Sequence, residues 1–343
     1  MSKLPFASDY MEGAHPNIIR ALTETNLMGT AGYGTDEITC EARRKVAKAC
    51  GCPDADVFFL IGGTQTNATV IDGFLQGYEG VIAADTGHIA LHEAGAIEFG
   101  GHKVLTVPHT LGKIEPDVLR SYLADHAADG NYDHMVIPGM LYISQPTEFG
   151  TLYSLKELQK LRSICDDYHL SFYLDGARLA YALSTPSNDV TIRDIARLCD
   201  VFYIGGTKCG AMIGEAVVIP QKGRIPHFFT TIKQHGALLA KGRILGIQFD
   251  TLFTDDLYFH LGDYAIKAAD EIRAAIDKKG RRQQFVAPTN QIFLIIDNEE
   301  LKTFGEKVAY SFWEKYDETH TVLRLATSWA TTPENVQKLI DLL

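Results

Sequence analysis

Short apolar runs alternate with amphipathic stretches along the first 245 residues of the chain. Residues 154–169 carry apolar side chains at the three- and four-residue intervals of one helix face, and the apolar run LSFYLDG (170–176) follows them. The same order returns in the predicted helix 191–200 and the predicted strand 201–207. Further apolar runs predict strands at 56–63, 80–85, 102–108, 134–144 and 215–220. Because strands and helices alternate, we expect an α/β fold, a mostly parallel sheet with helices on both faces.

The pattern changes after about residue 245. A long helical stretch at 262–281 is followed by strand-like runs at 291–297 and 322–327. A chain of 343 residues is also long for one small core. We therefore predict a large α/β domain over 1–245, whose N-terminal segment contributes to the site, and a smaller C-terminal α+β domain over 246–343.

Composition and charge exclude several classes of protein. Hydrophobic residues make up 46% of the chain and charged residues 22%, as in ordinary soluble globular proteins. The formal net charge of −11 argues against nucleic acid or an anionic membrane as the main partner. No apolar run approaches the roughly 20 residues that span a bilayer, and the N-terminus lacks the apolar core of a signal peptide. The six cysteines show no CxxC spacing, so we expect a cytoplasmic protein without a disulfide framework or zinc site.

Two opposite charges stand just past two strand candidates of the large domain. Asp175 follows the run SFYL, and Lys208 follows VFYIGGT. In open α/β sheets, ligands bind beyond the carboxyl ends of the strands. The two charges could form an ion pair that caps the sheet, or they could bind the two ends of one cofactor.

Pyridoxal phosphate is a cofactor that needs such a pair. It requires an amine for a Schiff base, a carboxylate that keeps its pyridine nitrogen protonated, and a phosphate site. Lys208 and Asp175 fit the first two roles. Gly63 and Thr64 open a predicted helix whose free N–H groups could bind the phosphate, helped by the Thr207 hydroxyl. An ordinary capped helix would explain the glycine-rich stretch equally well.

Several motifs carry a resemblance to a known family. The motifs are GYGTDEIT (32–39), GGTQTN (62–67), GHIALHEAGA (87–96), YLDGARLAYA (173–182), GGTKCGA (205–211) and VLRLATSW (322–329). In this order they resemble the low-specificity L-threonine aldolases and β-eliminating lyases, which are fold type I pyridoxal phosphate-dependent enzymes. The resemblance covers nearly the whole chain, and DGAR is its most specific element.

The resemblance implies a role for each matching residue. Lys208 matches the lysine that forms the Schiff base, and Asp175 matches the carboxylate at the pyridine nitrogen. Arg178 resembles the arginine that binds the substrate carboxylate. Arg324 and Ser8 look like two further contacts of the same carboxylate. Bidentate binding by guanidinium suits that task, although a strand arginine could equally lie on the solvated surface.

Two histidines four residues apart raise the question of a metal. His88 and His92 precede Glu93 in a stretch that begins like the zinc motif HExxH, but the second histidine of that motif would fall at Ala96. We therefore predict no metal, with a bare histidine pair as the remaining alternative. The resemblance instead makes His88 the ring that stacks on the cofactor and a candidate base toward the substrate β-hydroxyl, with Glu93 supporting the site.

Some positions depart from the family pattern. Tyr173 stands where a histidine is common, the turn after Lys208 lacks the usual proline, and the phosphate turn reads GGT rather than SGT. The stretch 233–248 is rich in cations and glycine. The resemblance implies that it reaches the phosphate of a neighbouring subunit in a homodimer or homotetramer, with Lys241 or Arg243 as the contact. A surface helix would explain this stretch nearly as well.

The resemblance implies cleavage of the Cα–Cβ bond of β-hydroxy-α-amino acids. L-threonine or L-allo-threonine would give glycine and acetaldehyde by a retro-aldol reaction. A β-eliminating lyase acting on another amino acid would share Lys208, Asp175 and the phosphate turn, so these residues do not separate the two. A non-catalytic binding protein on the same fold is the third reading, and the joint presence of Lys208, Asp175 and Arg178 argues against it.

Overall fold

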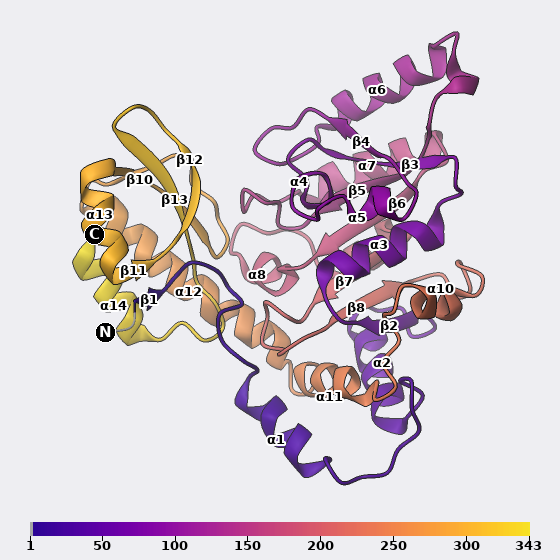
Figure 1. The fold of residues 1–343 in the computed structure, drawn as a ribbon, viewed down its shortest axis with the longest axis horizontal. Coiled ribbons are helices and arrows are strands. Elements are labelled where there is room, and N and C mark those ends of the chain that lie inside the picture. Colours follow the sequence, from indigo (N-terminus) through magenta and orange to yellow (C-terminus); the bar gives the residue numbers. More distant parts are fainter. Residues whose placement is uncertain (1–2) are drawn as a thin grey trace.

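A seven-stranded sheet forms the centre of the larger part of the molecule (Figure 1). The computed structural model describes residues 3–343. The strands are β2 (Asp56–Leu60), β3 (Glu79–Ala84), β4 (Val104–Val107), β5 (Ile137–Ser144), β6 (Ser171–Gly176), β7 (Val201–Gly205) and β8 (Glu215–Ile219). Their order is β2-β8-β7-β6-β5-β3-β4. Strand β8 runs in the direction opposite to that of the other six strands. The predicted α/β class with a mostly parallel sheet is therefore confirmed.

The sheet buries both of its faces, which explains why its strands read as apolar runs. Along β5, Leu141 and Ile143 pack into one core, whereas Met140 and Tyr142 pack into the other. The first core includes helices α2 (Glu37–Ala49), α6 (Pro116–Ala128), α7 (Leu155–Asp167), α9 (Ile192–Leu198) and α11 (Arg243–Leu252). The second includes α3 (Gly63–Phe74), α5 (Ala96–Phe99) and α10 (Phe228–Gln234).

Two of the predicted helices begin with a capping box. Ser154 caps α7 together with Glu157, and Thr191 caps α9 together with Asp194. Each hydroxyl accepts a backbone N–H of the first turn while the acidic side chain accepts the N–H of the cap residue, so free donors of the helix start are satisfied. These caps explain why both helices begin where the sequence pattern predicts them.

A smaller antiparallel sheet lies to the side of the large one (Figure 1). Its order is β12 (Ser311–Lys315), β13 (His320–Ala326), β10 (Gln291–Asp297) and β9 (Arg282–Gln283). Helices α13 (Asn298–Lys307) and α14 (Pro333–Leu342) contribute to its core. Helix α12 (Leu257–Lys278) serves both parts, because Ala265 and Ile266 pack into the large core while Ala269 and Ile272 pack into the small one.

The N-terminal segment begins in the smaller part. Strand β1 (Leu4–Pro5) pairs in parallel with β11 (Val308–Ala309), and Phe6 is fully buried in the small core. The chain then crosses to α1 (Pro16–Glu24), which packs against the large part. The remaining short helices are α4 (His88–Leu91), α8 (Leu179–Ser184) and the 3₁₀ turn Tyr132–His134. The domain boundary near residue 245 stays a prediction.

No helix among residues 3–343 combines the length and the apolar character needed to cross a lipid bilayer.

Truncating Phe6 should destabilise the small core. Phe6→Ala removes a fully buried ring, and such changes cost about 3–5 kcal/mol. We expect a lower urea midpoint of unfolding, followed by circular dichroism. Phe99→Ala is the control, because its ring is 97% exposed and its loss should cost less than about 0.5 kcal/mol. Equal midpoints for the two variants would show that the N-terminal segment does not contribute to this core.

Candidate active site

A cavity of about 610 Å³ lies where the large sheet meets the smaller one. The large part contributes Lys208, Arg178 and His88, and the smaller part contributes Trp313 and Arg324. Its remaining lining residues are Tyr10, Thr86, Leu91, His92, Glu148, Phe149, Ser311, Phe312 and Glu314. The cavity therefore brings together five of the cationic or imidazole side chains that the sequence singles out, including His92.

Lys208 lies in the turn after β7, half-buried at the wall of this cavity. Its ammonium group is 5.9 Å from the centre of the Tyr10 ring. Burial lowers the pKa of Lys208, and the nearby Arg178 lowers it further, whereas Asp9 and Asp175 act in the opposite direction. A lowered pKa leaves more of the neutral amine, which is the nucleophilic form that condenses with an aldehyde.

Asp175 is buried at the end of β6, beside the strand that leads to Lys208. Its Oδ2 accepts hydrogen bonds from the Tyr142 hydroxyl at 2.6 Å and from Asn67 Nδ2 at 3.2 Å. Its Oδ1 accepts the Ala177 N–H at 2.9 Å. Three donors therefore fix both oxygens of the carboxylate in place.

Asn67 connects Asp175 to His88. It donates from α3 to Glu93 Oε1 at 2.7 Å, and the same oxygen is 2.7 Å from His88 Nδ1. Its own carbonyl accepts the hydroxyl of Tyr173 at 2.7 Å, at the position where the family often has histidine. Sequence analysis missed Asn67, although it lies one helical turn beyond Gly63 on the predicted phosphate helix.

Glu93 supports His88 from a fully buried position. Its side chain is 0% exposed, whereas the His88 ring is 36% exposed and lines the cavity. Within residues 3–343, Glu93 Oε2 has no hydrogen-bond partner. The rings of His88 and His92 lie with their centres 5.7 Å apart, and no group of three potential metal ligands occurs among the described residues.

Arg178 forms a bidentate ion pair with Asp9. Its Nε is 2.5 Å from Oδ2 and its second amino group is 3.0 Å from Oδ1. Asn290 also donates to Asp9 Oδ2, at 2.9 Å. Although burial raises the pKa of Asp9, Arg178 and Lys208 hold it below its ordinary value. The ion pair therefore fixes Arg178 at the cavity wall, and Asp9 is a second residue that sequence analysis missed.

Arg324 approaches the same cavity from β13. Leu323 and Leu325 point into the small core, so Arg324 faces the opposite side of the strand, as the alternation predicts. Its guanidinium makes only long contacts, at 3.3 Å to Gln291 Oε1 and 3.2 Å to Ser311 Oγ. Burial lowers its pKa and Arg178 lowers it further. Two neighbouring guanidinium groups create a site that favours an anion such as a carboxylate.

The start of α3 offers backbone donors for a phosphate. Its cap residue, Gly62, has no side chain to satisfy the N–H groups of the first turn, which includes Gly63 and Thr64. Unpaired N–H groups at the start of a 12-residue helix favour an anion. A Cβ on Gly63 would lie 3.2 Å from the Tyr203 hydroxyl, so the close approach favours glycine.

Glu215 is a buried carboxyl next to the lysine turn. Its Oε2 accepts the Gly206 N–H at 3.0 Å. Burial raises its pKa to about 8, although a hydrogen bond from Thr207 and the charge of Lys208 act in the opposite direction. The Thr207 hydroxyl also accepts a hydrogen bond from the backbone N–H of Gly214, at 3.1 Å, across the turn between β7 and β8. Sequence analysis missed Glu215 because it reads as the first residue of an apolar strand.

The residues that line this cavity do not include the predicted cofactor contacts Asp175, Gly63, Thr64 and Thr207, or the predicted residues Ser8, Lys241 and Arg243. Ser8 is not among the lining residues, although its neighbour Asp9 holds Arg178. Lys241 is exposed, and Arg243 donates to the carbonyls of Met28 and Asn26 at 2.6 and 2.9 Å. Lys241 and Arg243 therefore do not contribute to the cavity of their own chain.

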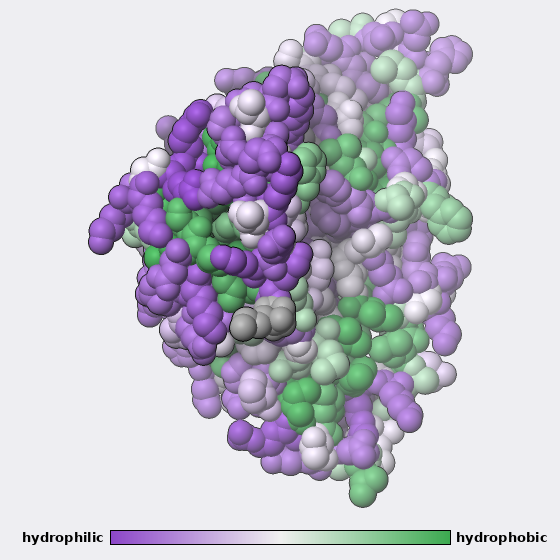
Figure 2. Space-filling model, turned by 60° about the vertical axis from the view of Figure 1, so that its left-hand side comes forward, coloured by the Kyte–Doolittle hydropathy of each residue, from purple (hydrophilic) through white to green (hydrophobic). Residues whose placement is uncertain are grey.

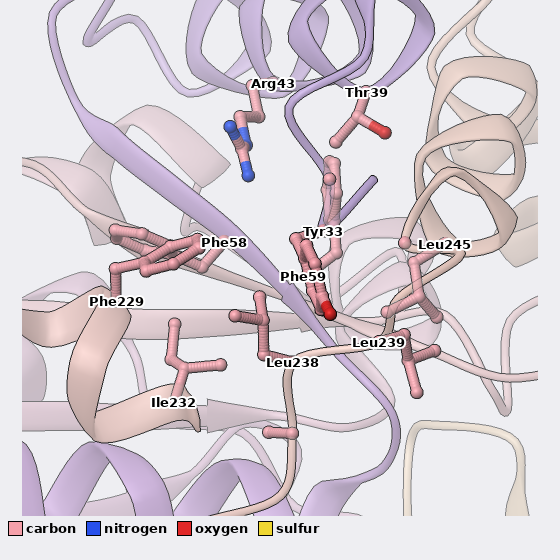
Figure 3. A pocket seen from close by; sticks show the side chains of 13 residues that line it. Tyr33, Thr39, Arg43, Phe58, Phe59, Phe229, Ile232, Leu238, Leu239 and Leu245 are labelled. Carbon is pink, nitrogen blue, oxygen red and sulfur yellow. The ribbon is translucent and has the colours of Figure 1, made fainter. Parts of the chain in front are cut away.

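A second cavity lies beneath the segment that leads to Lys241. Figure 3 shows Phe58 and Phe59 of β2, Arg43 of α2, and Leu238 and Leu239 of the segment around it. Its volume is about 20 Å³. A space of that size holds about one water molecule, so it is not a substrate site.

The residues around the large cavity fit pyridoxal phosphate. Lys208 is an amine with a lowered pKa, Asp175 is a fixed carboxylate, and the start of α3 is uncapped. The buried hydroxyls of Thr66 and Thr86 have no hydrogen-bond partner within residues 3–343, so polar groups remain for a ligand. Together with the sheet order, this donor set defines a pyridoxal phosphate-dependent enzyme of fold type I.

Comparison with known proteins places the chain more narrowly. It belongs to the β-eliminating lyase family, whose model matches residues 5–302. It is 28% identical over 337 residues to the low-specificity L-threonine aldolase of Pseudomonas aeruginosa, covering 97% of this chain and 95% of that one. A structure of Leishmania major threonine aldolase superposes with a TM-score of 0.95 and 41% identity, covering 98% of both chains. The predicted family, cofactor and enzyme class are confirmed.

More distant structures share the fold alone. A Thermus thermophilus aspartate aminotransferase superposes with a TM-score of 0.69 at 14% identity, covering 99% of this chain and 90% of that one. This likeness confirms the predicted fold type I architecture.

Replacing Glu215 should flatten the pH dependence of stability. In the unfolded chain this carboxyl ionises near 4.5, but in the folded protein it keeps its proton until about pH 8. Between these values the folded state binds the extra proton, so its contribution to stability falls as pH rises. We expect Glu215→Gln to lose that fall, measured as thermal midpoints of the cofactor-free protein at pH 5, 6, 7 and 8.

The control for this series is Glu306→Gln, because Glu306 is exposed on α13. It should follow the wild-type pH profile. A Glu215→Gln profile as steep as that of the wild type would show that Glu215 does not carry this proton.

Proposed function

We propose that the protein cleaves L-threonine and L-allo-threonine to glycine and acetaldehyde with pyridoxal phosphate. The observation that carries this proposal is the meeting of Lys208, Arg178 and Arg324 in one cavity that His88 also lines. An amino acid substrate needs its carboxylate anchored within reach of the cofactor. The two arginines supply that anchor, and the curated relatives named above are threonine aldolases.

Each residue near the cofactor then has a defined task. Lys208 would hold the cofactor, Asp175 would bind its pyridine nitrogen, and Gly63, Thr64 and Thr207 would bind its phosphate. When bound, the cofactor supplies a protonated ring that withdraws negative charge from the substrate Cα. The hydrogen bonds from Tyr142 and Asn67 keep the Asp175 carboxylate oriented for this contact.

The substrate carboxylate is bound by Arg178 and Arg324. Asp9 already occupies two donors of Arg178, so its remaining N–H groups and the loosely held Arg324 are available to the substrate. Ser8 is the proposed third contact. A carboxylate held in one orientation determines which bond at Cα stands perpendicular to the cofactor ring, and so which bond breaks.

His88 is the proposed ring that covers the cofactor. Glu93 binds its Nδ1 and fixes the orientation of the imidazole, while Nε2 remains free for the cavity. The sequence left open whether His88 also takes the proton of the substrate β-hydroxyl.

Two alternatives are less favoured. β-elimination on another amino acid would use the same lysine and carboxylate, but the curated relatives with near full-length coverage are threonine aldolases. A non-catalytic binding protein would have little use for an amine of lowered pKa beside two arginines.

The proposal includes a homodimer or homotetramer in the cytoplasm. Hydrophobic residues gather on the lower part of the face in Figure 2, and Figure 1 draws α1 at this lower end of the molecule. Ile19 of α1 is exposed, as are Leu27 and Met28 of the loop that follows it. Arg243 binds this same exposed loop, which supports an interface in which Lys241 or Arg243 reaches the phosphate of a neighbouring subunit. Free cysteines support a reducing compartment.

Removing the amine of Lys208 should abolish the reaction. We expect Lys208→Ala to release no measurable acetaldehyde from either threonine isomer and to lack the visible absorption of a lysine-bound cofactor. The assay couples acetaldehyde to alcohol dehydrogenase. Lys222→Ala is the control, because this lysine is exposed, and it should retain wild-type rates. Full activity in Lys208→Ala would refute the proposed role of the amine.

Replacing Arg324 should weaken substrate binding. Arg324→Lys keeps the charge but loses the fork that binds a carboxylate bidentately. Charge-assisted hydrogen bonds contribute about 1.5–3 kcal/mol, so we expect kcat/KM to fall roughly 10–100-fold, mainly through KM. Arg282→Lys, at an exposed arginine of β9, should change neither constant. Unchanged kinetics in Arg324→Lys would show that the carboxylate binds elsewhere.

A further inference from the structure

The carboxyl group of Glu148 has no role in the mechanism above. Glu148 lines the cavity from the loop after β5 and is half-buried. Its Oε1 accepts hydrogen bonds from the backbone N–H of His88 at 3.0 Å and from the Ser144 hydroxyl at 2.8 Å. Within residues 3–343, no other residue donates a hydrogen bond to Oε2. One oxygen is therefore anchored, and the other remains available to a ligand in the cavity.

The surroundings of Glu148 suit proton transfer. Burial raises its pKa and the charge of Asp175 raises it further, while its own backbone N–H, Ser144 and His88 act in the opposite direction. A carboxylate of raised pKa is a stronger base than an ordinary one and is therefore better suited to accept a proton. The titratable groups that face it are Asp175 at the end of β6, His88 of α4, Tyr142 of β5 and Tyr153 of the loop before α7.

His88 and Glu148 are two candidate bases of this cavity, beside His92, whose ring centre lies 5.7 Å from that of His88. The His88 ring is held by Glu93 and is proposed to lie over the cofactor. Because the bond that breaks stands perpendicular to the cofactor ring, the substituents on Cβ project beside an imidazole stacked there. The carboxyl that is anchored to the His88 backbone is placed for that position.

We propose that Glu148 accepts the proton of the substrate β-hydroxyl, an inference that rests on the proposed function. The hydroxyl proton moves to Oε2, the Cα–Cβ bond breaks, and the oxygen becomes the carbonyl oxygen of acetaldehyde. The electron pair of the broken bond stays on Cα. Cα then gains one proton to give glycine, and Glu148 loses the proton that it accepted and returns to its carboxylate form. The reaction therefore has no net gain or loss of protons.

Two reactions of the holoenzyme separate this role from a structural one. Acetaldehyde release from L-threonine needs an acceptor for the β-hydroxyl proton. Exchange of the glycine α-proton in D₂O, followed by NMR, needs the cofactor, Lys208 and the arginines but no such acceptor. We expect Glu148→Gln to lower kcat for cleavage at least about 100-fold and to change exchange less than about threefold. The residual cleavage should also lose the acidic limb of its pH profile.

Two further variants complete the test. Glu314→Gln removes another carboxyl from the lining of the same cavity and should change both reactions less than about threefold. His88→Phe keeps an aromatic ring over the cofactor, and we expect it to lower both reactions to a similar extent because it changes the stacked ring.

Four results would overturn the inference. Equal loss of cleavage and exchange in Glu148→Gln would assign Glu148 a structural role, and unchanged cleavage would remove it from the reaction. Selective loss of cleavage in His88→Phe, with Glu148→Gln active, would make His88 the base. A wild-type protein that exchanges the glycine proton but cleaves neither threonine isomer would refute the proposed function itself, and the inference with it.

Discussion

A buried ion pair joins the three parts of the chain that meet at the cavity. Asp9 comes from the N-terminal segment, Arg178 from the loop after β6, and Asn290 from the residue before β10. Removing two charges from water costs several kcal/mol per ion unless geometry and further hydrogen bonds satisfy them. The bidentate contact and the Asn290 amide meet that condition. Because the guanidinium is fixed, the position of the substrate carboxylate in our proposal, and therefore the choice of reacting bond, depends on this pair.

The rest of the site is organised by a second set of buried hydrogen bonds. Asn67 connects Asp175, which faces the cofactor nitrogen in our proposal, with Glu93 and so with the ring of His88. A change at either end therefore alters the hydrogen bonding of the other. Tyr173 replaces the histidine common in the family, yet its hydroxyl binds Asn67 and maintains the connection. Departures from the family pattern at this position thus leave the arrangement of the carboxylate intact.

The sequence predicted the charged side chains that follow the strands. It did not predict the residues that orient the site side chains through hydrogen bonds. Lys208 and Asp175 follow apolar runs, so the rule for open α/β sheets finds them. Asn67 and Glu148 carry no such local signal. Their roles depend on hydrogen bonds to Asp175 and His88, which lie 108 and 60 residues away in the sequence. The pairing of Leu4 with Val308 is equally invisible to local periodicity. Arg178 and Arg324 were found through the family resemblance, and Asp9 became visible only through its contact with Arg178.

The central claim is that this cavity binds an amino acid between two arginines, beside a cofactor held by Lys208. A crystal structure of the holoenzyme with glycine tests it most directly. Our account predicts that the glycine carboxylate contacts both Arg178 and Arg324, with the cofactor nitrogen at Asp175 and the phosphate at the start of α3. A glycine carboxylate bound away from both arginines, or a cofactor attached to a lysine other than Lys208, would contradict it.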